Sequence, residues 1–154
     1  MEYWKHLKIG DLFRIRVPLA SRARIEEDEA TVAIRIGEGE DASELLIANF
    51  PLTMPSSEPA ELMNTLRGII EEFFHGPVPE AGGHILDYTV EVDEDPENAA
   101  WTAAGIARAL DDCAWVAKAY TRVRDDHFWL LHWNGPATDV ESVLKMLSSF
   151  KIGA

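Results

Sequence analysis

Apolar and polar side chains alternate along several short stretches of the chain, a pattern typical of β-strands with one buried face. Residues 12–17 alternate between apolar and basic side chains until Pro18 interrupts them. Residues 21–25 and 30–36 repeat the alternation on either side of an acidic turn, which predicts a hairpin. Residues 44–50 are apolar on both faces, as expected of a central strand that is covered on each side.

The C-terminal half shows the same alternation, bounded by short acidic or glycine-rich turns that favour antiparallel hairpins. Four strands are predicted there, at residues 85–92, 101–110, 115–123 and 128–133. The first of them is expected to point Leu86, Tyr88, Val90 and Val92 to one side. Residues 99–110 are rich in alanine, so a helix stays open as an alternative for that stretch.

Two segments instead repeat their apolar residues every three and four positions, the period of a helix buried on one face. The first is residues 57–75, with Ser57 as its predicted N-cap. The second is residues 138–150, where Thr138 and Glu141 stand at the spacing of a capping box. Together these patterns predict one α+β domain over residues 1–154: a mostly antiparallel sheet of six to eight strands with two main helices.

The chain is acidic, with 14 basic and 27 acidic residues and a net charge of −13. Such a charge repels phosphate backbones and anionic lipid headgroups, so we expect neither nucleic acid nor a membrane surface as a partner. The acidic residues gather at 26–29, 38–41 and 91–95, which we interpret as solvated loop tips.

Cys113 is the single cysteine, which rules out an internal disulfide and is typical of a reducing compartment. The first residues lack the apolar stretch of a signal peptide, and no later run approaches the ~20 apolar residues of a membrane span. A cytoplasmic location is therefore predicted, although a leader removed beforehand would leave the same sequence.

Motifs that carry chemistry are missing from the sequence. The five histidines lie at no zinc-binding spacing, and there is neither a nucleophile elbow nor a phosphate-binding glycine loop. Acidic residues next to Cys113 disfavour its thiolate. We therefore predict no catalytic residue, no metal ligand and no cofactor.

The order of elements resembles the PsbP-like superfamily, which includes a photosystem II protein, a Ran-binding nuclear factor and bacterial secretion adaptors. The resemblance rests on residues 13–18, the helix after Pro59, the aromatic strand 128–133 and the closing helix 143–151. It implies an αβα sandwich that binds proteins or assists assemblies, usually without catalysis. The sequence lacks the lipoprotein or transit segment of many members, which puts a thylakoid or envelope role in doubt.

A candidate partner-binding surface lies on the hairpin predicted around Asp125 and Asp126. With the turn centred there, Arg122 lies opposite Trp129, Tyr120 opposite Leu131 and Lys118 opposite Trp133. Aromatic rings beside cations are common in protein interfaces. The predicted site residues are Lys118, Tyr120, Arg122, Trp129 and Trp133. The alternative is that the second helix covers these rings, which would make them core.

Three functional hypotheses remain open at this point. The first is a non-enzymatic binding or adaptor module for a protein or peptide partner. The second is an enzyme or small-molecule binder with a pocket between sheet and helix. That pocket would have Trp101, Trp115 and Tyr88 as walls and His84, Asp87 or His132 as polar groups. The third is a structural subunit of a larger complex.

Overall fold

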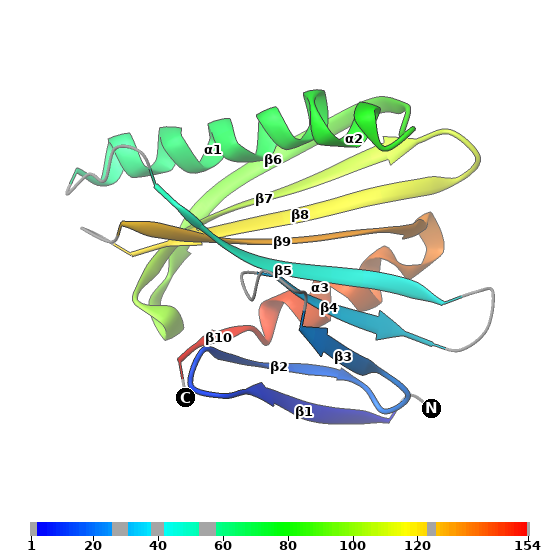
Figure 1. The fold of residues 1–154 in the computed structure, drawn as a ribbon. Helices are drawn as coiled ribbons and strands as arrows, with labels where there is room; N and C mark the ends of the chain where they lie inside the picture. The colour runs from blue at the N-terminus through cyan, green and yellow to red at the C-terminus, as the bar shows by residue number, and fades with distance from the viewer. Residues whose placement is uncertain (1–2, 26–30, 38–41, 53–57, 123–125, 154) are drawn as a thin grey trace.

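Seven antiparallel strands form the larger of two sheets in the computed structural model, which describes residues 3–25, 31–37, 42–52, 58–122 and 126–153 (Figure 1). The order across this sheet is β3-β4-β5-β9-β8-β7-β6. The strands are β3 Arg22–Ile25, β4 Thr31–Ile36, β5 Ser43–Pro51, β6 Ile85–Asp95, β7 Ala100–Ala109, β8 Cys113–Thr121 and β9 His127–Pro136. The alanine-rich stretch is thus a strand, β7, and the helical alternative is wrong.

A second sheet of three strands brings the two ends of the chain together. It consists of β1 Trp4–Ile9, β2 Phe13–Pro18 and β10 Lys151–Ile152, in the order β1-β2-β10. The predicted strand at residues 12–17 is therefore confirmed, but it belongs to this smaller sheet. Its apolar side chains, Phe13, Ile15 and Val17, are buried.

Helices lie on both faces of the large sheet, as the αβα prediction requires (Figure 1). Helix α1, Pro59–His75, packs on β6, β7 and β8. Helix α3, Val140–Ser148, lies on the opposite face with the small sheet, against β8, β9 and β2. A short helix α2, Pro77–Glu80, and two 3₁₀ turns, Pro96–Asn98 and Ala137–Asp139, complete the elements. Within the described ranges, no helix is both long enough and apolar enough to cross a membrane.

The core beneath α1 joins large helix residues to small strand residues. Leu62, Leu66, Ile70, Phe73 and Phe74 form the buried stripe of the helix. They meet alanines of β7 and β8, which lets the helix approach the sheet closely: Ala103, Ala107, Ala117 and Ala119. Gly105 sits at the closest approach, where a Cβ atom would lie 2.7 Å from the Phe74 ring. The predicted apolar periodicity of this helix is confirmed.

The helix ends differ in detail from the sequence prediction. Ser57 lies outside the described residues, and the N-cap of α1 is Glu58, which makes no side-chain capping bond. The predicted capping box of the second helix is wrong, because Thr138 lies within the 3₁₀ turn and α3 starts only at Val140. Its N-cap, Asp139, also makes no side-chain capping bond.

Two features of the β6–β7–β8 meander correct or confirm the turn predictions. Residues 91–95 belong to strand β6 and not to a loop tip, because their acidic side chains alternate with Val90 and Val92. The acidic turn between β7 and β8 is confirmed, since Asp111 and Asp112 both have positive φ, at 60° and 56°. This is the backbone that a two-residue hairpin turn requires.

The start of β6 contains a register shift between Ile85 and Asp87. As a result Ile85 packs toward the core under α1, together with Tyr88, and Leu86 is 51% exposed. The prediction that Leu86 shares a face with Tyr88 is therefore wrong, because a bulge inserts an extra residue that strict alternation does not anticipate.

Candidate functional site

The predicted binding surface lies on the face of the large sheet that carries α3, but in a different register. Tyr120 pairs with Trp129, Lys118 with Leu131 and Val116 with Trp133. The offset from the prediction is two residues, so the same side chains still share one face of the sheet.

Two of the five predicted residues belong to the core. Tyr120 and Trp133 are each 1% exposed and pack in the cluster with α3. The Tyr120 hydroxyl donates a hydrogen bond to the Leu147 carbonyl at 3.0 Å, and burial raises the pKa of Tyr120. The Trp133 indole donates to the Ser43 hydroxyl at 2.9 Å. A partner therefore cannot reach these two rings without displacing α3.

The other three predicted residues remain partly accessible. Trp129 is half-buried, with its ring edge-on to Phe13 and Phe150 at centroid distances of 5.6 and 5.7 Å. The Lys118 ammonium lies 5.0 Å from the Tyr120 ring centroid. Burial lowers the pKa of Lys118, against the raising effect of the carboxylates of Asp95 and Asp93.

Arg122 contacts Asn98, a residue that no sequence motif marks as functional. Its Nε donates to the carbonyl of Asn98 at 2.8 Å. The Asn98 side chain is buried, donates to Asp95 and to the Phe150 carbonyl, and accepts from the Ile152 amide. Asn98 thus ties β6, α3's end and β10 together, and no local pattern around it signals this long-range role.

The sheet face around Lys118 continues onto β7 and β6, beyond the strands on which α3 packs. Lys118 pairs with Ala104 and Ala104 with Glu91, so all three point the same way. We call this region the open face. It consists of Asp87, Thr89, Glu91, Asp93, Ile106, Arg108 and Lys118. All of these are exposed except Lys118, which is half-buried.

Charge on the open face is mostly negative and is partly organised by one ion pair. Arg108 binds the Asp87 carboxylate with two nitrogens, the shorter contact being 2.5 Å. This hydrogen bond lowers the pKa of Asp87, but both side chains are well exposed, so the pair adds little stability. Glu91 and Asp93 extend the acidic row along β6 beside the exposed side chain of Ile106.

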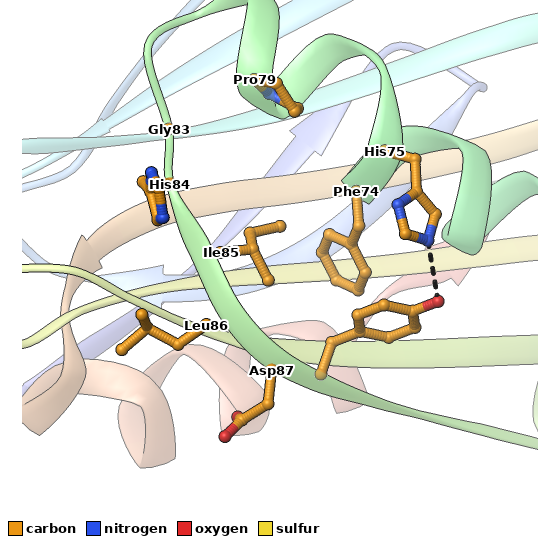
Figure 2. Close-up of a pocket in the computed structure, with 9 residues that line it drawn as sticks. Phe74, His75, Pro79, Gly83, His84, Ile85, Leu86 and Asp87 are labelled. Atoms are coloured by element: carbon orange, nitrogen blue, oxygen red, sulfur yellow. Dashed lines mark hydrogen bonds between the residues drawn. The ribbon is translucent and has the colours of Figure 1, made fainter.

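A hollow of about 460 Å³ lies where α1, α2 and the start of β6 meet (Figure 2). Its wall residues are Phe74, His75, Pro79, Gly83, His84, Ile85, Leu86, Asp87 and Tyr88. His75 and Tyr88 share a hydrogen bond of 3.0 Å between Nε2 and the hydroxyl. His84 lies apart from His75, with Ile85 and Phe74 between them (Figure 2).

The hollow gathers half of the residues predicted for a pocket. Tyr88, His84 and Asp87 line it, and His75 joins them from the last turn of a helix that periodicity treated as purely structural. Trp101, Trp115 and His132 do not line it but pack beneath α1. His132 lies 4.7 Å from the Phe73 ring, and burial lowers its pKa to about 4.

Clusters of possible metal ligands and the single cysteine were the remaining places for chemistry in the part of the chain that the structure describes. Those residues contain no group of three or more His, Cys, Asp or Glu side chains placed to hold a metal ion. Cys113 is partly buried, and its Sγ lies 3.7 Å from the Asp111 carbonyl.

No family model matches the sequence, and no curated protein matches it. The fold, by contrast, is shared with solved structures. Cyanobacterial PsbP (CyanoP) from Synechocystis aligns with a TM-score of 0.67 at 12% identity, over 99% of this chain and 94% of that chain. The Ran-binding protein Mog1p of Saccharomyces cerevisiae aligns with a TM-score of 0.60, also at 12% identity, over 99% of this chain and 96% of that chain. The chain therefore has the PsbP-like fold that its sequence resembles.

Proposed function

We propose that the protein is a non-enzymatic accessory module that recognises a protein or peptide partner. The observation that carries this proposal is the open face, a part of the large sheet that α3 does not cover and that carries an exposed Ile106 beside an acidic row. A shared fold with Mog1p, a protein described as Ran-binding, is consistent with a protein partner.

The chemistry of the open face favours a basic partner. Its carboxylates attract and orient cationic groups over several ångströms, and this raises association rates at low salt. Ile106 and the aliphatic stem of Lys118 supply apolar contact at the centre of the face. Of the residues predicted from sequence, Lys118, Arg122 and Trp129 remain proposed contacts, because each is partly accessible.

Reversing one charge on the open face should weaken partner capture at least tenfold, because the carboxylate both steers and contacts the basic partner. We would immobilise the wild type and Glu91→Lys and identify proteins retained from a lysate of the native source. Glu72→Lys, an exposed position on α1, is the matched control with the same charge change.

The expected result is a protein retained by the wild type and by Glu72→Lys but lost from Glu91→Lys. Equal retention by all three, with circular dichroism showing that each is folded, would move the binding surface elsewhere. Retention of nothing in repeated trials would contradict the proposed function. A cytoplasmic location is part of the same proposal, and fractionation of the native source tests it.

A small-molecule site at the hollow is the second candidate, because the hydrogen-bonded pair of His75 and Tyr88 lines it on one side, His84 lines it on the other, and apolar side chains lie between them. A ligand present at a free concentration of 100 times its Kd stabilises the native state by about 2.7 kcal/mol, which a thermal-shift screen of metabolites detects. The expected shift saturates and is lost in His84→Ala, an exposed position whose truncation leaves the fold intact. A broad library that gives no shift contradicts this second candidate.

A further inference from the structure

Strand β6 forms one edge of the seven-stranded sheet and, among the described strands, pairs only with β7. It is 11 residues long, whereas β3 at the opposite edge has only four. An edge strand presents a row of backbone N–H and C=O groups to any further strand. Natural proteins block long edge strands against further pairing. The features that block β6 therefore show which of its residues can still pair with another strand.

Both ends of the β6 edge are closed, and among the described residues its middle accepts a contact from a flexible side chain. The bulge at Leu86 interrupts the start, and the Glu94 amide is occupied by Asp93 Oδ1 at 2.8 Å. Between them, the Val90 carbonyl accepts a long bond of 3.4 Å from the guanidinium of Arg67. That contact is exposed and easily exchanged, which leaves residues 88–93 open to strand pairing.

The same contact shows which backbone groups face outward. The Val90 carbonyl reaches Arg67 on α1 and therefore points away from β7. In an antiparallel ladder the outward groups recur at every second residue. Tyr88 and Val92 consequently direct their backbone groups to the free edge as Val90 does, and a new strand would bond to these residues.

The side chains of β6 determine what a new strand must carry. On the open face stand Thr89, Glu91 and Asp93, all exposed. On the α1 side stand Tyr88, Val90 and Val92, which are half-buried at the rim of the core. Directly opposed residues of paired strands lie on the same face, where unlike charges and apolar pairs stabilise the pairing.

We propose that a partner binds this protein by adding an extended, antiparallel strand to the free edge of β6, and that this strand alternates basic and apolar residues. The basic residues lie beside Glu91 and Asp93, and the apolar ones lie beside Tyr88, Val90 and Val92. The inference rests on the proposed function as a protein-binding module and names the partner's chemistry.

Charge also selects between this partner and a second copy of the chain. Two β6 strands paired antiparallel would bring acidic residues against one another on the open face, which destabilises the pair. Strand β3 of a second copy alternates arginine with Ala23 and Ile25, but it offers only four residues. A longer segment that alternates basic and apolar residues can pair with more of the free residues of β6.

The direct probe is a synthetic nine-residue peptide that alternates lysine and valine, with both ends blocked, titrated into the ¹⁵N-labelled full chain. We expect saturable shifts and slowed hydrogen exchange at the amides of Tyr88, Val90 and Val92. A peptide of the same composition with its lysines grouped together should bind at least tenfold more weakly. Glu91→Lys should lose at least tenfold in affinity for the alternating peptide, and Glu72→Lys should keep the wild-type value.

Backbone methylation of the peptide separates strand addition from simple charge attraction. The backbone groups of Tyr88, Val90 and Val92 point to the free edge, so each bonds to the peptide residue directly opposite. Those peptide residues are the valines, because their side chains lie on the α1 side, as do Tyr88, Val90 and Val92. Methylating the valine amides should abolish binding, and methylating the lysine amides should leave it within about threefold.

Three results would overturn the inference. Equal binding by both methylated peptides would reduce the interaction to charge alone, and no binding by the alternating peptide would remove the edge as a site. In either case the lysate experiment still decides the proposed function independently. Concentration-dependent self-association in sedimentation, abolished by Arg22→Glu, would assign the β6 edge to β3 of a second copy instead.

Discussion

Replacing Leu66 by alanine is expected to lower the free energy of unfolding by ~2–5 kcal/mol. Leu66 is fully buried at the middle of α1, in the cluster that contains Ala103, Ala107 and Ala117. Those alanines are fixed by hydrogen-bonded strands on both sides, so the sheet cannot collapse into the cavity that the truncation leaves. The loss is therefore a large share of the stability of an ordinary small domain.

Urea denaturation followed by circular dichroism measures this loss. Asn64→Ala, at an exposed position of the same helix, should change the unfolding free energy by less than ~0.5 kcal/mol. Phe73→Ala should resemble Leu66→Ala, because Phe73 is also buried and contacts Trp115 and His132. A loss below ~1 kcal/mol for Leu66→Ala would mean that this stripe of α1 does not face a packed core.

Acidification from pH 6.5 to pH 4 is expected to cost about 3 kcal/mol of stability through His132 alone. Burial lowers the pKa of this imidazole from 6.5 to about 4. As the pH falls below 6.5, the unfolded chain gains a proton at His132 that the native state does not bind until about pH 4. The native state is thus fully favoured above pH 6.5 and loses this contribution progressively toward pH 4.

The effect is isolated by comparing the pH dependence of unfolding in wild type and in His132→Phe, which cannot titrate and keeps a ring against Phe73. Their difference in unfolding free energy should change by about 3 kcal/mol between pH 7 and pH 4. His6→Phe, at an exposed position of β1, should follow the wild type. Parallel curves for wild type and His132→Phe would show that the buried imidazole does not contribute.

Hydrophobic periodicity predicts correctly those elements that bury a single face and keep a regular pattern of apolar residues. The stripe of α1 and the alternation of β2 are confirmed because each reflects a single buried face. The acidic residues at 91–95 were assigned to a loop from their charge, although they keep the alternation of a strand. Their position on β6 follows from that alternation, since an exposed strand face tolerates acidic side chains.

Long-range contacts could not be predicted in the same way. The alternative that the second helix covers the aromatic rings is confirmed for Tyr120 and Trp133, but the residues around them could not decide it, because the covering residues follow later in the sequence and belong to a different element. The same holds for Asn98, because two of its hydrogen-bond partners, Phe150 and Ile152, lie more than fifty residues away. The hollow combines the end of α1 with the start of β6, whereas the pocket predicted from the sequence lies between sheet and helix.

The closing strand β10 has a consequence for the order in which the molecule folds. It pairs with β2, and the Gly153 amide bonds to the Leu12 carbonyl at 2.7 Å, so the first hairpin of the chain receives its third strand from the last residues. The buried residues of the core beneath α1 fall between Leu66 and Leu130, so during synthesis they leave the ribosome before α3 and β10 do. The hairpin of β1 and β2 must wait, with Phe13 and Ile15 uncovered, until α3 and β10 have left the ribosome. We therefore expect the two sides of the sheet to form at different times, with the α3 side last and most exposed to misassembly.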